Sequence, residues 1–251
     1  MKVSVITACY NSASTILDTI RSVEHQTYRD IEHLFVDGGS VDATIDIIQA
    51  NCSPGAKILT GPDRGVYDAL NKGLRASSGE LVGFLHADDV YAGHEVIETV
   101  VNLMTADSLD ALYGDVEFVR ADNLAKVVRR YSSRRFRPSR IAWGWMPAHP
   151  ALFVARSVFR RFGEFKTDYK IAGDFEFIAR VFSKSELRYR YLPKVLVRMR
   201  MGGISTQGLR STIIINQESL RACRENGIRS NYLKILSKYP AKALEFFRVG
   251  N

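Results

Sequence analysis

The first 120 residues alternate short strand-like runs with longer segments whose apolar residues recur at helical spacing. Helical patterns follow Ser14 and Asp42, and two more cover residues 66–76 and 93–104. The strand-like runs between them are VSVIT (3–7), IEHLFVD (31–37), KILT (57–60), ELVGFLH (80–86) and ALYGDVEFV (111–119). This β-α-β-α order predicts an α/β fold with a Rossmann-like, mostly parallel central sheet flanked by helices.

Polar residues follow each of the first four predicted strands. The segments are TACYNSAS, DGGSVD, GPDRGVYDA and HADD, in chain order. In open α/β sheets, ligands bind in the crevice beyond the carboxyl ends of the strands. The sequence therefore predicts a ligand site at this edge, although ordinary turns also favour Asn, Asp, Gly and Ser.

The second half of the chain is less regular and carries most of the positive charge. Residues 1–125 contain 8 Lys and Arg against 19 Asp and Glu, whereas residues 126–251 contain 27 against 8. Such a basic half favours an anionic partner such as phosphate, nucleic acid or a membrane surface, and scattered surface charge is the alternative. No apolar run is long enough to predict a membrane-spanning helix, and the amino terminus lacks a signal-peptide pattern, so we expect a cytoplasmic protein.

The pattern after residue 120 predicts a simple domain organisation. Further strands are expected at VVRRY and ALFVA, one helix over 172–182, and two more over about 209–226 and 230–247. We expect one domain over 1–205, with a nucleotide-binding half (1–120) and an acceptor half (121–205), and a C-terminal helical extension over 206–251. Three widely spaced cysteines predict neither a disulfide framework nor a zinc site.

Several residues at the strand ends have side chains suited to nucleotide binding. Asp37 in DGGSVD can accept hydrogen bonds from a base or ribose, or can organise the turn. Arg64 and Lys72 are two of the few cations in the acidic half and suit a phosphate. An i,i+4 pair between Asp68 and Lys72 is the simpler interpretation of that lysine.

Asp88 and Asp89 come directly after a buried strand and suit a hard divalent cation. Such an ion commonly takes one or two protein carboxylates and completes its shell with substrate phosphates and water. Adjacent residues of an extended segment point in opposite directions, so one aspartate is expected to face the ligand while the other orients the loop.

Two later segments offer further candidates. Asp174 in GDFEF lies at the predicted start of a helix, where a carboxylate can act as a general base or simply stabilise the helix terminus. WGWMPAHPALF contains Trp145 and His149; an indole suits a sugar ring and an imidazole suits a metal, while a place in the core is the alternative for both.

In combination, these segments resemble glycosyltransferase family 2, the inverting nucleotide-sugar transferases of GT-A fold. The likeness covers about residues 1–182, and its first ninety residues are the most specific because several motifs recur in the same order. The residues that carry it are VSVITACYNSASTILDTIRSVEHQTYRDIEHLFVDGGSVDAT, DRGVYDALNKGLRASSGELVGFLHADD, HPALF and AGDFEF.

The resemblance implies a role for each matching position. Asp174 matches the catalytic base, Asp88 the metal-binding aspartate of the D-x-D motif, and Asp89 its acidic follower. His149 matches a histidine that can complete the metal site in some members. Trp145, with its aromatic face, is expected to support the site beside these residues. The positions implied in nucleotide binding are Thr7, Ala8, Tyr10, Asp37, Asp63, Arg64, Lys72, His86 and Ala87. His86 stands where the motif usually has its first acid, and Gly173 where it has a glutamate.

The expected function is therefore a metal-dependent, inverting transfer from a nucleotide-diphosphate sugar, expected to be a UDP-sugar. The expected cofactor is Mn²⁺ or Mg²⁺. The expected acceptor is a lipid-diphosphate-linked saccharide used in surface polysaccharide assembly. The basic half of the chain would bind the anionic inner face of the cytoplasmic membrane. The Q-x-x-R-W motif of processive synthases is missing, which favours single addition. A non-catalytic nucleic-acid- or nucleotide-binding protein is the alternative, although no RNP, KH or helix-turn-helix signature supports nucleic-acid binding.

Overall fold

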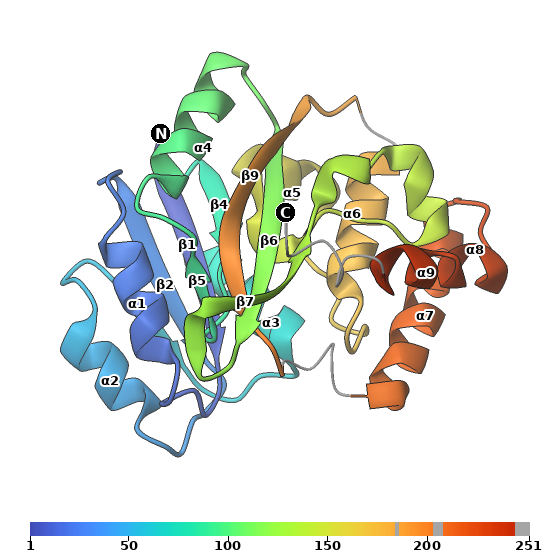
Figure 1. The fold of residues 1–251 in the computed structure, drawn as a ribbon. Helices are drawn as coiled ribbons and strands as arrows, with labels where there is room; N and C mark the ends of the chain where they lie inside the picture. Colours follow the sequence, from blue (N-terminus) through green and yellow to red (C-terminus); the bar gives the residue numbers. More distant parts are fainter. Residues whose placement is uncertain (184–185, 203–207, 244–251) are drawn as a thin grey trace.

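Nine strands form one sheet in the part of the chain that the computed structural model describes, residues 1–183, 186–202 and 208–243 (Figure 1). Along the sheet the order is β3-β2-β1-β4-β8-β6-β9-β5, and β7 pairs with β6. The strands are β1 (Val3–Cys9), β2 (Ile31–Asp37), β3 (Lys57–Thr60), β4 (Leu81–Phe84), β5 (Asp89–Tyr91), β6 (Ala111–Arg120), β7 (Asn123–Tyr131), β8 (Leu152–Ala155) and β9 (Tyr189–Arg200).

The first four sequential strands pair with one another in parallel. β1 pairs in parallel with β2 and β4, and β2 with β3. Cys9 is level with Asp37, and Asp37 with Thr60, so three strands end at the same edge. The α/β fold and its flanking helices were predicted correctly, and the loops expected to form a site do lie at one edge.

The remaining strands extend this sheet through antiparallel pairs and one further parallel pair, β6 with β9. β8 pairs antiparallel with both β4 and β6, and β5 pairs antiparallel with β9. The sequence analysis missed β5 and β9. Pro193 interrupts the alternation of β9, and it lies at a bulge where the register jumps from Tyr113–Tyr191 to Asp115–Val195.

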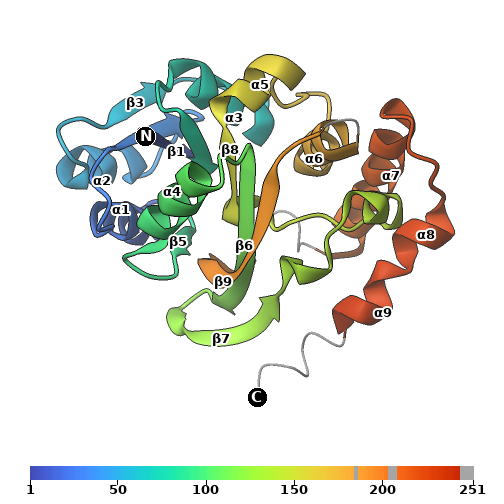
Figure 2. The same ribbon diagram turned by 90° about the horizontal axis from the view of Figure 1, so that it is seen from above.

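Helices cover both faces of the sheet, as Figure 2 shows from above. Successive strand residues point to opposite faces, so Ile6 packs with Leu70 on one side while Val5 packs with Val100 on the other. The first face is covered by α3 (Val66–Ala76), α5 (Arg156–Phe162) and α6 (Gly173–Ser183), and the second by α1 (Ile16–Glu24), α2 (Thr44–Asn51) and α4 (Val96–Ala106). Short 3₁₀ turns lie at Ser133–Arg135, Pro138–Trp143 and His149–Ala151.

The C-terminal helices lie beyond α6, at the side of the molecule farthest from α1 and α2 (Figure 1). α7 (Gly208–Glu225) matches the predicted helix at about 209–226, and its Cys223 joins the same core cluster as α6. The second predicted helix is instead two, α8 (Tyr232–Leu236) and α9 (Lys238–Ala243), and its remainder, 244–247, lies outside the described residues. Pro240 has no N–H for the Leu236 carbonyl, which accounts for the interruption.

Candidate active site

The loops after β1 and β2 are bonded into one rim at the carboxyl edge of the sheet. Asn11 N donates to Ser40 Oγ over 2.8 Å, and Val41 N donates to Asn11 Oδ1 over 2.9 Å. Ala13 N reaches Asp42 Oδ2 at 3.1 Å. Asn11 has φ +47°, a left-handed conformation that Asn tolerates better than most residues. The rim is therefore held by side-chain-to-backbone bonds that cross between two strand ends.

Asp37 is buried and organises the second loop. Its Oδ2 accepts the N–H groups of Gly39 and Ser40 at 2.9 Å each, and its Oδ1 accepts the Ser40 hydroxyl and, over 3.9 Å, the Cys9 thiol. These four donors match the acceptor capacity of a carboxylate. Within this structure Asp37 shapes the loop, and its predicted contact with a base stays a prediction.

Tyr10 and Asp63 flank the backbone of Gly38. A Cβ at Gly38 would lie 2.6 Å from Asp63 Oδ2 and 3.5 Å from Tyr10 Cδ2, so the absence of a side chain lets these two residues approach. Tyr10 is exposed and offers a ring face to solvent. Thr7 is not at this rim: its side chain is fully buried and bonded to His33 Nε2 at 2.9 Å, while Ala8 packs against the core.

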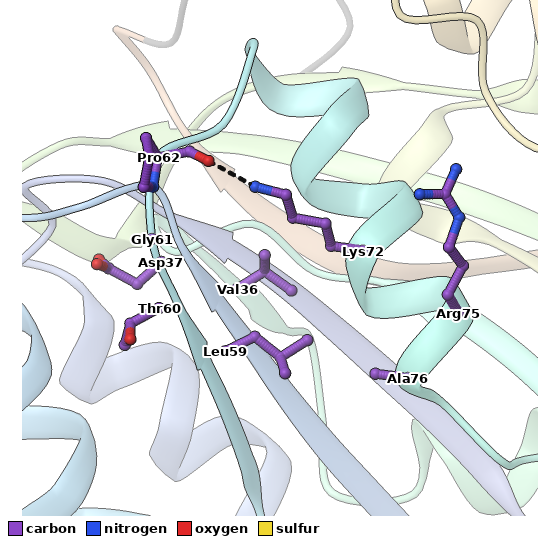
Figure 3. Close-up of a pocket in the computed structure, with 9 residues that line it drawn as sticks. All are labelled: Val36, Asp37, Leu59, Thr60, Gly61, Pro62, Lys72, Arg75 and Ala76. Carbon is purple, nitrogen blue, oxygen red and sulfur yellow. Dashed lines mark hydrogen bonds between the residues drawn. The ribbon is translucent and has the colours of Figure 1, made fainter.

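A pocket of about 700 Å³ lies beside this rim, between α3 and strands β2 and β3 (Figure 3). Lys72 Nζ donates to Pro62 O over 2.7 Å and lies 3.8 Å from Asp68, so the simpler i,i+4 pair exists alongside a second contact. Arg64 is exposed and pairs with Asp68 at 3.4 Å. The lining residues are Val36, Asp37, Leu59, Thr60, Gly61, Pro62, Lys72, Arg75 and Ala76.

The loop after β4 separates Asp88 from Asp89, as the sequence predicted for adjacent residues. Asp88 is half-buried, whereas Asp89 is buried as the first residue of β5. Burial and the neighbouring Asp88 carboxylate raise the pKa of Asp89 well above its usual range. Two residues outside the loop fix it: Thr19 Oγ1 donates to Asp89 O over 2.8 Å, and Arg200 Nη1 donates to Asp88 O over 2.9 Å.

His86 and His149 lie near each other, and the rings continue from them towards α6. The ring centroids of the two histidines are 6.0 Å apart; Phe165 follows 5.6 Å from His149, and Tyr67 lies 5.9 Å from Phe165. Burial is the main cause that lowers the pKa of His149 to about 3, so that imidazole is neutral, and burial also lowers the pKa of His86 from its usual value against the raising effect of Asp88. We call His86, His149, Phe165 and Tyr67 the aromatic row.

Asp174 lies at the other end of the aromatic row, in the first turn of α6. Its Oδ1 accepts the N–H of Phe175 over 2.8 Å and lies 3.4 Å from the Tyr67 hydroxyl. The residue is partly exposed, and burial is the main cause that raises the pKa of its carboxyl to about 6. A carboxylate with such a pKa is a stronger base than an exposed aspartate and is still ionised at neutral pH.

The comparison with known families agrees with this arrangement. The profile of "Glycosyl transferase family 2" matches residues 4–169, which include both strand-end loops, the β4 loop and His149. The chain belongs to glycosyltransferase family 2. Asp174 lies five residues beyond the matched range, so its assignment depends on the AGDFEF motif and on the geometry described above.

Curated relatives of this family 2 glycosyltransferase are also glycosyltransferases. An uncharacterized glycosyltransferase of Mycobacterium tuberculosis is 34% identical over 183 residues, which are 71% of this chain and 68% of that protein. A PGL/p-HBAD biosynthesis glycosyltransferase of Mycobacterium bovis is 31% identical over 215 residues, 84% of this chain and 80% of that protein. Both support the enzyme class.

Solved structures confirm the GT-A fold. S. aureus TarS 1–349 in complex with UDP-GlcNAc superimposes with a TM-score of 0.71 at 18% identity, covering 100% of this chain and 74% of that one. The mannosyltransferase PcManGT of Pyrobaculum calidifontis, in complex with GDP-Man and Mn²⁺, gives 0.65 at 20% identity, covering 98% and 70%.

The donor set at the β4 loop fits a cation that is held mainly by a substrate diphosphate. Across the described residues, no group of three or more His, Cys, Asp and Glu gathers as a metal cluster. Asp88 supplies one accessible carboxylate, and the buried Nε2 of His149 has no hydrogen-bond partner. One carboxylate, with positions left for phosphate oxygens and water, suits Mn²⁺ or Mg²⁺, and the imidazole of His149 suits Mn²⁺ less well than an oxygen ligand.

Trp145 occupies a different place from the one that a sugar contact requires. Its side chain is buried in the core cluster on the α4 side of the sheet, with Tyr131 and Phe153, whereas Trp143 is exposed. The sequence analysis also missed Arg200 and the contact of Tyr67 with Asp174. Tyr67 lies within the quoted DRGVYDA motif, but nothing in its spacing indicates a contact across 107 residues.

Proposed function

We propose that this glycosyltransferase moves a sugar from a nucleoside-diphosphate donor, a UDP-sugar, to a hydroxyl group of a saccharide acceptor with inversion at the anomeric carbon. The observation that carries the proposal is the aromatic row, which runs from His86, beside the half-buried Asp88, to Tyr67, beside an Asp174 of raised pKa. A diphosphate-side carboxylate and an acceptor-side base are the two groups that such a transfer needs.

In this mechanism the residues of the chain have separate tasks. The rim with Tyr10 and Asp63 binds the nucleoside, and Lys72 and Arg64 lie near the diphosphate. Asp88 and His149 would hold a divalent cation, which, when bound, neutralises charge on the departing diphosphate. Asp174 accepts the proton of the acceptor hydroxyl as that oxygen bonds to the anomeric carbon and the bond from this carbon to the diphosphate breaks. One displacement inverts the configuration.

The decisive test is Asp174→Asn, assayed by release of nucleoside diphosphate across a panel of nucleotide sugars with and without Mn²⁺. We expect the wild-type enzyme to use one donor, and the variant to lose about 10²–10⁴-fold in kcat while retaining donor binding. A folded variant with full transfer activity would refute the base. A wild-type enzyme that is not stabilised thermally by any nucleoside diphosphate would refute the donor class.

The acceptor is proposed to be a lipid-diphosphate-linked saccharide presented at an anionic membrane. Tyr232, Leu233 and Leu236 are exposed apolar residues of α8, and the exposed Trp143 ends the 3₁₀ turn Pro138–Trp143. Lys234 Nζ on α8 lies 5.6 Å from the Trp143 ring. Aromatic and aliphatic side chains mixed with cations are typical of interfacial binding. No helix among the described residues is long and apolar enough to cross a membrane.

Sedimentation with vesicles tests this surface. Leu233→Asp removes the most exposed apolar side chain of the patch and is expected to weaken binding to vesicles containing anionic phospholipid. Ile213→Asp, at an exposed apolar residue of α7, is the matched control and is expected to bind as the wild type does. Equal binding by all three proteins, or no salt-sensitive binding by the wild type, would contradict the membrane proposal.

A further inference from the structure

The turn that leads into α6 donates three consecutive backbone N–H groups to one carboxylate. Lys170 N donates to Glu218 Oε1 over 2.7 Å, and Ile171 N and Ala172 N donate to Glu218 Oε2 over 2.9 and 2.8 Å. Glu218 is on α7, which the sequence analysis assigned to a separate helical extension. Charge-assisted bonds of this kind are stronger than neutral ones, so α7 fixes the backbone immediately before Asp174.

The same turn is held from the opposite side by α3. The Tyr67 hydroxyl donates to the Ile171 carbonyl, so both backbone groups of Ile171 are bonded to side chains from two different helices. The Tyr67 ring lies against Gly173, where a Cβ would meet three ring carbons at 2.8–2.9 Å. Asp174 is the next residue, and its Oδ1 is 3.4 Å from the same hydroxyl.

We propose that Glu218 and Tyr67 are positioning residues that hold Asp174 in its productive orientation, so that α7 is a working part of the active site. The inference rests on the proposed role of Asp174 as the base. A turn fixed on one side only could rotate about the other contact, whereas bonds to its N–H groups from α7 and to its carbonyl from α3 set both its place and its direction. Misplacement of a catalytic group by about 1 Å can cost about 10²-fold in rate.

The charge of Glu218 gives the proposal a readout that a purely structural role would not move. Among the described residues, the titratable groups that contribute most to the pKa of Asp174 are Tyr67 on α3 and Glu218 on α7. The negative charge of Glu218 contributes to the raised pKa of Asp174, after the larger effect of burial. Replacing Glu218 by a neutral residue therefore lowers the pKa of Asp174 as well as loosening the turn.

The experiment compares the pH dependence of kcat for the full-length wild-type enzyme and three variants. Glu218→Gln keeps the shape of the side chain but removes the charge, and its amide N–H₂ opposes at least one of the three donors. Tyr67→Phe keeps the ring and removes only the hydroxyl. Glu225→Gln is the matched control, because Glu225 is on the same helix and bonds Lys166, Tyr169 and Arg221 but not the turn.

We expect Glu218→Gln to lose about 10–100-fold in kcat with little change in KM for the donor. The fall of its kcat on the acid side of the pH profile is expected to move to lower pH. Tyr67→Phe is expected to lose about 10-fold, and Glu225→Gln less than 2-fold. The proposal would be overturned if Glu218→Gln and Tyr67→Phe both kept the kcat of the wild type and its fall in kcat at the same acid pH. It would also be overturned if Glu225→Gln lost as much kcat as these two variants. If Glu218→Gln does not fold, Tyr67→Phe decides alone.

Asp174→Asn, measured alongside, separates this inference from the function on which it rests. If Asp174→Asn is inactive while Glu218→Gln and Tyr67→Phe behave as the wild type, the base stands and the positioning role is wrong. If Asp174→Asn retains full activity, the base assignment itself is wrong.

Discussion

Gly173→Ala should destabilise the protein because the space beside residue 173 is already filled. The added Cβ would lie 2.8 Å from Tyr67 Cε2 and 2.9 Å from its Cδ2 and Cζ, whereas ordinary contacts begin at 3.4 Å. The ring cannot easily withdraw, since it is buried, bonded through its hydroxyl to Ile171 O, and packed 5.9 Å from Phe165. Overpacking of this kind costs about 1–3 kcal/mol.

Urea unfolding with linear extrapolation measures this cost. Gly93→Ala is the matched control, because its Cβ would meet nothing within 4 Å, and it should change the free energy of unfolding by less than about 0.5 kcal/mol. In a Tyr67→Ala background the clash is absent, so Gly173→Ala should lose most of its effect and give a coupling energy of about 1–2 kcal/mol. Wild-type stability of Gly173→Ala, or an equal cost in both backgrounds, would refute the reasoning.

Three further outcomes follow from buried charges and from the β4 loop. Asp174 has a folded pKa of about 6, above its unfolded value, so its protonated form stabilises the fold at low pH and this contribution is lost as pH rises through 6. We therefore expect kcat to fall below pH 6, and Asp174→Asn to raise the free energy of unfolding at pH 8 by about 1–3 kcal/mol. An unchanged free energy of unfolding in Asp174→Asn would contradict the burial argument. The Ser4 hydroxyl and the N–H groups of Ser78 and Gly79 donate to Glu32 and lower its pKa, so its contribution is present above the unfolded pKa and is lost as pH falls through the folded one. Glu32→Gln should cost about 2–4 kcal/mol by urea unfolding at pH 7, and progressively less as pH falls below the unfolded pKa. With Asp88 in its proposed role as metal ligand, Arg200→Lys should raise the Mn²⁺ concentration for half-maximal activity, because the bond to the Asp88 carbonyl is weakened. An unchanged Mn²⁺ titration would exclude that role for Arg200.

The parallel half of the sheet could be predicted because its signals are local. Strands such as IEHLFVD are short apolar runs bounded by turn residues, and the helices between them have clear periodicity. β9 could not be predicted in the same way, because Pro193 and alternating arginines obscure it and its pairing depends on β6, some eighty residues earlier. β5 is only three residues long, and it becomes a strand because β9 lies beside it.

The site divides along the same line between local and distant information. The positions of Asp88 and Asp174 follow from motifs, and the opposite exposure of Asp88 and Asp89 follows from strand geometry. The sequence does not reveal that Thr7 turns inward to His33 or that Trp145 joins the core, because each depends on contacts that form only when the sheet is assembled. Glu218, in particular, lies outside residues 1–182, the part of the chain that resembles the family.

The structure gives a physical reason for glycine at the position where the family motif has glutamate. Tyr67 occupies the space that any side chain at Gly173 would need, and its hydroxyl bonds the backbone two residues earlier. Glu218 supplies a carboxylate to that same turn from another helix. Where the motif lacks its glutamate, Tyr67 and Glu218 therefore bond the turn before Asp174 from two different helices. Gly173→Glu would therefore displace Tyr67 from the turn before Asp174, and we expect it to destabilise the protein more than Gly173→Ala and to lower kcat.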